Sequence, residues 1–152
     1  MAGFTNRGKY LFMQYATGTA SPPTSFYMAL CTSATAPTVD TNTLSQLTEI
    51  AAGNGYTSGG LVVERSATGF PTVTENDSTD LASATIKNLS FTASGGNLPA
   101  SGSGARYAVL TTDEGTVGNR QIIAYYDLSS DRTVSSGQSL QLNAFLLQFT
   151  ET

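Results

Sequence analysis

The 152-residue sequence predicts a mainly β protein, which is a single β-sandwich or distorted barrel with an N-terminal helix and one short helix. Three observations predict this fold class. Short runs rich in Thr, Val, Ile, Tyr and Phe suit a pleated, half-covered sheet. Gly, Asn, Asp and Ser, which supply turns, separate these runs. No internal repeat and no linker divides the chain, so residues 1–152 are expected to form one domain.

The first element is a predicted helix over residues 4–16. Thr5 or Asn6 can cap its first backbone N–H groups, and Gly18 stands just past its expected end. The side chains expected to face the core are Tyr10, Phe12 and Met13. Gly8 lies inside this helix, where glycine costs about 1 kcal/mol relative to alanine. Its presence therefore indicates that a neighbouring group needs the space.

The clearest strand covers residues 25–32 and follows a turn at 21–24. Its side chains alternate between two apolar faces, with Phe26, Met28 and Leu30 on one and Tyr27, Ala29 and Cys31 on the other. Such a pattern is typical of a central strand covered on two sides. Cys31 is the single cysteine, so it cannot close a disulfide within the chain. It is expected to be a small buried hydrophobe.

A second, short helix is predicted over residues 44–52. Thr43 and Gln46 match the capping box, in which a Thr hydroxyl and a Gln amide each satisfy a backbone N–H group. One face of this helix would be apolar through Leu44, Leu47 and Ile50. The helix is expected to stop at the turn 53–55, where glycines adopt positive φ at little cost.

The rest of the chain is expected to consist of strands and turns. The predicted strands are residues 61–65, 80–92, 105–112, 121–128 and 139–150. The turn 112–115 makes a hairpin of the strands on either side of it. A shift in the alternation between Ile86 and Leu89 indicates a bulge. Residues 66–80 and 93–104 are expected to be irregular connections, and the second of them is expected to be long and flexible.

Composition and charge argue against several functions. Seven Lys and Arg residues are scattered among eleven Asp and Glu, so we expect no concentrated positive surface and no nucleic-acid partner. The chain has no histidine, which removes the commonest general base and metal ligand. We therefore expect no catalytic residue, no cofactor and no metal. No stretch approaches the roughly 20 apolar residues of a membrane span, so no membrane partner is expected.

Four stretches, taken in order, are similar to those of a known family. They are residues 4–9 (FTNRGK), residues 26–33 running on to 37–41 (FYMALCTS and PTVDT), residues 53–60 (GNGYTSGG) and residues 105–110 (ARYAVL). In this order and spacing they resemble a family of small virion structural proteins of tailed bacteriophages. The resemblance covers nearly the whole chain. Each stretch alone is a turn with a strand, and the ordered set carries the resemblance.

The resemblance implies a structural component of a phage particle without enzymatic activity. Members of the family look like head-decoration, or cement, proteins, which sit on the outer capsid lattice and bridge subunits of the major capsid protein. The implied partners are the major capsid protein and further copies of this chain, as a trimer or another homo-oligomer. Such a protein is made in the cytoplasm of the host bacterium and ends on the virion. A tail component (tail tube, tail tip or fibre-associated) stays the alternative.

Three segments are predicted to contact partners. Residues 1–9 are polar and are expected to act as an N-terminal arm. The glycine-rich loops 53–60 and 93–104 can lie flat against a neighbour, although turn geometry alone also explains their glycines. The predicted interface residues are Phe4, Thr5, Asn6, Arg7, Asn54, Tyr56, Asn97 and Leu98.

Two ligand-binding interpretations of the sequence are weaker. Glu75, Asp77 and Asp80 offer the carboxylate oxygens that calcium prefers, but their spacing does not match a calcium loop. A solvated acidic turn explains them better. The seven tyrosines could stack on host-surface carbohydrate, but most of them lie in predicted apolar strands, and the chain has no Trp.

Paired carboxylates raise the question of hydrolysis. Asp113 with Glu114 and Asp127 with Asp131 could in principle divide the acid and base roles of a glycosidase. Such pairs arise by chance in any acidic domain, and the first pair lies in the predicted hairpin turn. We therefore interpret these carboxylates as structural.

Overall fold

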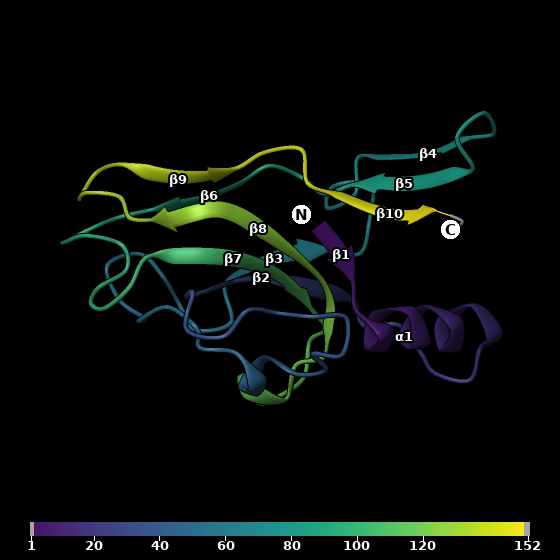
Figure 1. Ribbon diagram of the computed structural model, residues 1–152, viewed down its shortest axis with the longest axis horizontal. Helices are drawn as coiled ribbons and strands as arrows, with labels where there is room; N and C mark the ends of the chain where they lie inside the picture. The colour runs from purple at the N-terminus through teal and green to yellow at the C-terminus, as the bar shows by residue number, and fades with distance from the viewer. Residues whose placement is uncertain (1, 151–152) are drawn as a thin grey trace.

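The computed structural model describes residues 2–150 and confirms a mainly β fold (Figure 1). The strands are β1 (Ala2–Phe4), β2 (Ser25–Cys31), β3 (Leu61–Glu64), β4 (Thr72–Asn76), β5 (Leu81–Thr85), β6 (Leu89–Thr92), β7 (Ala105–Thr111), β8 (Ile122–Arg132), β9 (Ser139–Leu142) and β10 (Leu146–Thr150). The helical elements are α1 (Asn6–Thr17) and two 3-10 turns, η1 (Leu44–Gln46) and η2 (Val117–Asn119). The sheets do not close into a barrel, so the structure favours the sandwich alternative.

The largest sheet has five strands in the order β1-β8-β7-β2-β3, and every neighbouring pair is antiparallel. The strands β7 and β8 form the hairpin that the turn at 112–115 predicted. The strand β2 lies inside the sheet, and its residues from Met28 to Cys31 are completely buried. This burial confirms the prediction of a central strand covered on two sides, and it confirms Cys31 as a buried thiol.

Both faces of the five-stranded sheet are covered. The two-stranded ribbon of β6 and β9 lies over one face (Figure 1), and it contributes Leu89, Phe91 and Leu142 to the main core. The other face carries a smaller core, to which Leu44 and Leu47 around η1 contribute. Together these layers form a sandwich-like body, and we refer to it below as the body.

The ends of α1 agree with the capping residues that the sequence predicted. The Thr5 hydroxyl accepts a hydrogen bond from the backbone N–H of Gly8 at 2.8 Å, and Gly18 adopts a left-handed conformation at the C-cap. A Cβ atom on Gly8 would lie 2.2 Å from the carbonyl oxygen of Ile123. The glycine therefore allows α1 to pack directly on the backbone of β8, which confirms that a neighbouring group needs its space.

The predicted core face of α1 was partly wrong. Tyr10 and Met13 are 50% and 64% exposed, whereas Leu11 is buried and Phe12 packs against the core. The contact at Gly8 decides this orientation. At roughly 100° per residue, Tyr10 and Met13 fall on the side of the helix away from Gly8, and the side that meets β8 is left to Leu11 and Phe12.

The predicted second helix is a single 3-10 turn, η1. The Gln46 side chain closes this turn by accepting a hydrogen bond from the backbone N–H of Thr43 at 3.0 Å. Beyond the turn the chain is extended, because residues 48–50 exchange backbone hydrogen bonds with Leu30 and Thr32 at the end of β2. The strand β3 pairs only with residues 25–28 of β2. The edge of β2 beyond Met28 is therefore free to pair with residues 48–50.

A separate three-stranded sheet has the order β10-β5-β4, and we call it the small sheet. Three predictions were wrong here. Residues 66–80, expected to be irregular, contain β4, and the single strand expected over 139–150 divides into β9 and β10 around Ala144, whose φ is +54°. The strand expected over 80–92 divides into β5 and β6 where a bulge was expected. In both divided segments one half joins the small sheet and the other joins the β6–β9 ribbon.

The small sheet and α1 lie toward the same end of the molecule, while β6 and β9 lie toward the other end (Figure 1). The Tyr126 hydroxyl donates a hydrogen bond to the carbonyl oxygen of Leu146 at 3.1 Å, which ties β10 to β8 of the body. None of the helices within residues 2–150 is long and apolar enough to cross a membrane.

Candidate functional site

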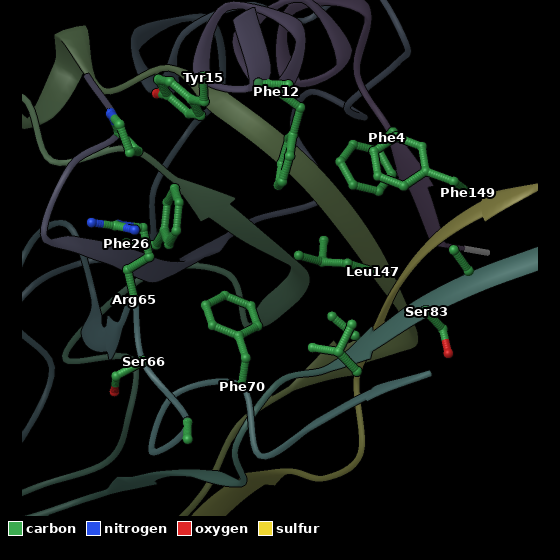
Figure 2. A pocket seen from close by; sticks show the side chains of 16 residues that line it. Phe4, Phe12, Tyr15, Phe26, Arg65, Ser66, Phe70, Ser83, Leu147 and Phe149 are labelled. Carbon is green, nitrogen blue, oxygen red and sulfur yellow. The ribbon is translucent and has the colours of Figure 1, made fainter. Parts of the chain in front are cut away.

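A cleft of about 730 Å³ lies between α1, the body and the small sheet, and we call it the aromatic cleft. Figure 2 shows its side chains converging from segments that are far apart in the sequence. The residues that line it are Phe4, Phe12, Tyr15, Ala16, Pro22, Phe26, Arg65, Ser66, Ala67, Phe70, Val73, Ala82, Ser83, Ala84, Leu147 and Phe149. A mostly apolar cleft of this size is typical of a binding site.

The alternation of side chains in the small sheet explains the apolar wall of the cleft. Val73 of β4, Ala84 of β5 and Leu147 of β10 lie opposite one another in the pairing register and share the face toward the cleft. Successive residues of a strand point to opposite faces, so the hydroxyl groups of Thr74 and its partner Ser83 turn the other way, although Ser83 also borders the cleft. Their hydroxyl groups are hydrogen-bonded at 3.0 Å on that outer face. Because alanines occupy the middle strand, the sheet leaves open volume that larger side chains would fill.

Aromatic rings hold the remaining walls together. The ring of Phe4 stacks on that of Phe149 with centroids 4.5 Å apart, and Phe12 meets both rings edge to face. On the other side of the cleft, Phe26 and Phe70 form an edge-to-face pair at 5.9 Å. Such pairs add about 0.5–1.5 kcal/mol each beyond the burial of their surface. They fix α1, β1 and β10 around the cleft without filling it.

Part of the cleft faces solvent. The side chain of Val73 is 74% exposed and that of Phe149 is 44% exposed, although both belong to the apolar face of the small sheet. Exposed apolar surface of this kind, grouped on one face and next to a hollow, is typical of sites that contact another molecule. The observation distinguishes this face from isolated hydrophobic residues elsewhere on the surface.

Charged residues are few at the cleft. Arg65 is the only charged residue among those that line it within residues 2–150, and its Nε donates to the carbonyl oxygen of Pro23 at 2.8 Å. Glu75 alternates with Val73 along β4 and lies opposite Ala82, so its side chain shares the cleft face near the far end of that strand. Neither Arg65 nor Glu75 forms an ion pair with a residue of the described chain.

The structure places the N-terminal predicted interface residues partly inside the molecule. Residues 2–4 form β1, which pairs with β8, so the described part of the segment is an element of the domain rather than a free arm. Phe4 is buried in the wall of the aromatic cleft, and Thr5 is buried beneath α1 as its N-cap. Asn6 is exposed and donates a side-chain hydrogen bond to Asp40 at 2.8 Å.

Arg7 lies at a second, polar hollow of about 390 Å³. Its Nε donates a short hydrogen bond to the side-chain oxygen of Gln121, whose amide nitrogen in turn donates to Glu114 at 2.9 Å. The residues lining this hollow are Arg7, Asn42, Thr43, Glu114, Asn119 and Gln121. Because Arg7, Gln121 and Glu114 are already hydrogen-bonded to one another in series, this hollow is less suited to a partner than the aromatic cleft.

The two predicted glycine-rich interface loops turn inward at their apolar residues. Tyr56 and Leu98 are buried within the described chain, and their contact with a partner stays a prediction. Leu98 exchanges two backbone hydrogen bonds with Val134, which holds the loop 93–104 against the body. Asn54 and Asn97 remain nearer the surface, and the Asn54 side chain donates to the carbonyl oxygen of Asn97 at 2.9 Å. The two loops therefore contact each other.

Tyr56 and Cys31 are buried in the body. The Tyr56 hydroxyl donates to Glu49 at 2.5 Å and accepts from the backbone N–H of Leu30 at 3.0 Å. Burial, together with the Glu49 carboxylate, raises the pKa of Tyr56. Burial also raises the pKa of the Cys31 thiol to about 12. A thiol with this pKa is almost entirely protonated near neutral pH, which makes it a poor nucleophile.

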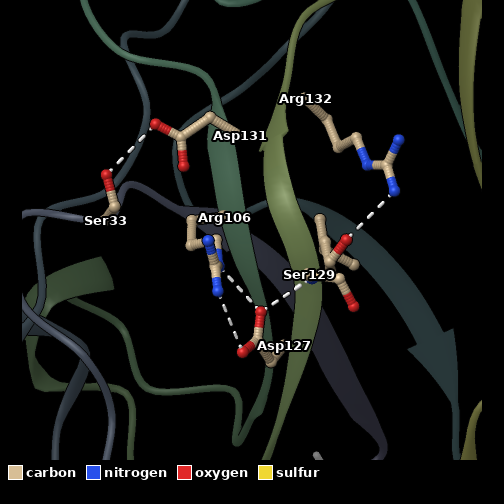
Figure 3. A network of polar contacts seen from close by, with 7 residues as sticks. Ser33, Arg106, Asp127, Ser129, Asp131 and Arg132 are labelled. Atoms are coloured by element: carbon tan, nitrogen blue, oxygen red, sulfur yellow. Dashed lines mark hydrogen bonds and ion pairs between the residues drawn. The ribbon is translucent and has the colours of Figure 1, made fainter.

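The carboxylates that could have formed a hydrolytic pair are engaged in structural contacts (Figure 3). Asp127 forms a two-pronged ion pair with Arg106, at 2.8 and 3.2 Å, and accepts from the backbone N–H of Ser129. The hydrogen bond from Arg106 holds the pKa of Asp127 below its usual value. Asp131 accepts a hydrogen bond from Ser33 at 3.1 Å. An ionised, paired Asp127 is unsuited to act as a general acid.

The acidic residues proposed as a weak calcium site lie at the exposed tip of the small sheet. Glu75 belongs to β4, and Asp77 and Asp80 belong to the turn that joins β4 to β5. No group of three or more Cys, Asp and Glu residues within the described part of the chain is arranged to hold a metal ion. Their positions fit the solvated acidic turn that the sequence suggested.

The functional candidate that sequence reasoning missed is the aromatic cleft. Of its residues only Phe4 was singled out as an interface residue, and it serves as a wall rather than an exposed contact. One local signal was present, because Thr72, Val73, Thr74 and Glu75 alternate in the way a half-covered strand does. The other walls come from segments whose proximity no local pattern shows.

The fold and the cleft together define a class: a mainly β, sandwich-like domain with an open aromatic surface beside a small sheet. No protein-family model, no curated protein and no solved structure matches the chain. What the protein does is therefore inferred from its own residues and their arrangement.

Proposed function

We propose that this protein is a bacteriophage head-decoration, or cement, protein, which binds the outer capsid lattice and bridges subunits of the major capsid protein without enzymatic activity. The proposal starts from the ordered stretches that resemble small phage virion proteins. The aromatic cleft supports it, because a structural partner needs a docking surface and the cleft offers one with a rigid body behind it. The engaged state of Asp127 and the protonated thiol of Cys31 also suit a protein that performs no bond chemistry.

The proposed mechanism is mechanical. Several copies, each with a modest affinity for the shell, hold neighbouring capsid subunits together through a high effective concentration. A protein that binds only the expanded shell stabilises that form by mass action, so no reaction is required. Ordered backbone and paired aromatic rings around the cleft limit the entropy that each docking event costs.

Purified virions test this proposal directly. We expect the chain to be present at a copy number comparable to that of the major capsid protein, and a gold-labelled antibody to mark the head surface in electron micrographs. Labelling that follows the tail would establish the tail-component alternative instead. Particles that lack the chain altogether, or label distributed over neither head nor tail, would contradict a virion role.

A further inference from the structure

The strand β4 is an open edge of the small sheet. It is hydrogen-bonded only to β5, and all five of its residues, Thr72–Asn76, are exposed. In an antiparallel pair, every second residue turns its backbone N–H and C=O away from its partner strand. The outer edge of β4 therefore presents unpaired backbone groups to solvent in the described part of the chain. Figure 1 shows β4 as the outermost strand of the small sheet, away from the body.

The same sheet has an apolar face that its own molecule only partly covers. Val73, Ala84 and Leu147 form a continuous row across the three strands, and the row ends at the open edge with Val73. A further strand beside β4 would extend this row by its own cleft-facing side chains. It would also cover the exposed part of Val73. The open edge of β4 and the apolar face beside it therefore both suit an extended polypeptide segment.

Two charged residues, Arg65 in the cleft lining and Glu75 on β4, decide which charges suit that chain once its direction is given. Arg65 lies on the segment that leads into β4, and Glu75 lies near the far end of β4 on the cleft face. Both pairings within the small sheet are antiparallel. A strand added antiparallel to β4 would begin near Glu75 and end toward Arg65. It is electrostatically matched when it carries a basic residue at its start and an acidic residue at its end.

We propose that the aromatic cleft and the edge of β4 together bind an extended segment of a partner protein, which adds a fourth strand to the small sheet. The segment pairs with the backbone of β4 and alternates apolar side chains, which enter the cleft, with polar ones on the outer face. A basic residue near Glu75 and an acidic residue near Arg65 set its register. Strand addition of this kind takes its affinity from main-chain hydrogen bonds and its specificity from pockets for alternate side chains.

This inference deepens the proposed function and rests on it for the partner, which would be a segment of the major capsid protein. The open edge favours a peptide over a lipid or another apolar small molecule. A peptide backbone can form hydrogen bonds with the unpaired N–H and C=O groups of β4, whereas a hydrocarbon chain cannot. The opposite charges of Arg65 and Glu75 favour a segment of mixed charge, whereas a fatty acid would match Arg65 alone.

A peptide-binding experiment on the purified full-length protein tests the proposal. The probe is a fluorescent, capped peptide in which valine and threonine alternate between an N-terminal lysine and a C-terminal aspartate. We expect saturable binding by fluorescence anisotropy, and slowed amide hydrogen exchange at residues 72–76 when the peptide is bound. A peptide of the same composition with its valines in one block should bind at least about tenfold more weakly, because it cannot place alternate side chains in the cleft.

Substitutions in the small sheet locate the binding. Ala84→Phe fills the cleft and should weaken binding at least about tenfold. Thr85→Phe adds the same ring to the outer face of β5, next to Ala84 and away from the open edge, and is the matched control, which should bind as the wild type does. Arg65→Glu leaves the cleft walls intact, so it stays informative if Ala84→Phe folds poorly. It should disfavour the original peptide and favour one that ends in lysine.

Several outcomes would overturn the proposal. These are absence of binding, equal binding by the blocked peptide, equal binding by Ala84→Phe, or protection from exchange that leaves out residues 72–76. Laurate that binds in a way Ala84→Phe abolishes, with no peptide binding, would assign the cleft to an apolar small molecule. Self-association that Ala84→Phe abolishes would assign it to a second copy. No phage particle enters this experiment, so its failure leaves the head-decoration proposal standing, and absence of the chain from heads leaves peptide binding standing.

Discussion

The five-stranded sheet and the small sheet differ in how many of their faces are covered. Strands β2 and β7 carry apolar side chains on both faces, and both faces are buried beneath other parts of the chain. The small sheet alternates apolar and polar residues, and its apolar face opens onto a cleft. The comparison teaches that most of the buried core lies in the first region, whereas uncovered apolar surface lies in the second.

The physical reason lies in the number of covered faces. A strand buried on both sides gains hydrophobic free energy from every residue, so the body tolerates little change. A strand covered on one side and placed at an edge gains far less, and substitutions there cost correspondingly little. The following predictions compare matched substitutions in the two regions.

The largest expected difference is between two phenylalanines. Phe91 of β6 is completely buried in the main core, and Phe91→Ala should lower the free energy of unfolding by about 3–5 kcal/mol through cavity formation. Phe149 of β10 is partly exposed beside the cleft, and Phe149→Ala should cost about 1 kcal/mol. Urea denaturation followed by circular dichroism measures both. Equal losses would show that the small sheet is as integral to stability as the body.

The contact between α1 and the body gives the next effect. Gly8→Ala places a methyl group against the carbonyl oxygen of Ile123 and should lower the free energy of unfolding by about 1–3 kcal/mol. Helix propensity alone would predict a gain of about 1 kcal/mol, so the two explanations differ in sign. The control is Lys9→Ala, the exposed neighbour, which should change stability by less than about 0.5 kcal/mol. A stabilised Gly8→Ala variant would contradict the close packing of α1 on β8.

Alkaline pH should weaken the body and its link to the small sheet. Burial raises the pKa of Tyr56 and Tyr126 above the ordinary value of 10.0. The unfolded chain therefore loses these protons at a pH where the folded chain still holds them. The free energy of unfolding should stay level below about pH 9 and then fall by about 1 kcal/mol per pH unit for each tyrosine above pH 10.

Urea denaturation at a series of pH values measures that slope. Tyr126→Phe removes one of these groups and should lower the slope by about 1 kcal/mol per pH unit, while it also removes the hydrogen bond from β8 to Leu146 of β10. Tyr56→Phe should lower the slope by a similar amount. The buried Cys31 thiol, whose pKa is also raised, contributes to the slope that remains. A slope that neither substitution changes would mean that other groups control alkaline unfolding.

The smallest effect is expected at the edge of the small sheet. Val73→Thr should change the free energy of unfolding by less than about 0.5 kcal/mol, because Val73 is largely exposed on β4. Val63→Thr is its matched counterpart on β3, where the side chain is completely buried. A buried hydroxyl without a partner should cost about 1–3 kcal/mol there. Thermal unfolding distinguishes the two, and similar costs would show that β4 is covered in solution.

Local patterns in the sequence predicted much of the body. The caps at Thr5 and Gly18 placed α1, the two apolar faces of residues 25–32 placed the central strand, and the turn at 112–115 placed the β7–β8 hairpin. Each of these features depends on residues close together in the chain. The same reasoning missed β4. The segment Thr72–Asn76 has a single strongly apolar residue, so its sequence resembles a polar loop when its pairing with β5 is unknown.

Predicted interface residues show where local reasoning stops. Tyr56 and Leu98 lie in glycine-rich loops, whose composition is typical of exposed surface. Both side chains are nevertheless buried, because the loops fold back on the body. The break between β9 and β10 likewise depends on which sheet each half joins, and alternation alone does not reveal this. Burial and sheet membership are properties of contacts between distant segments.

The sequence by itself determined that this protein is mainly β, that one capped helix opens it, and that Cys31 is an inert core residue. Those conclusions rest on periodicity and capping, which act over a few residues. Only the tertiary structure decided that an aromatic cleft exists, that Phe4 and Phe149 stack at its wall, and that β4 is left as an open edge. The cleft joins residues from both ends and the middle of the chain, and their proximity follows from packing of the whole domain.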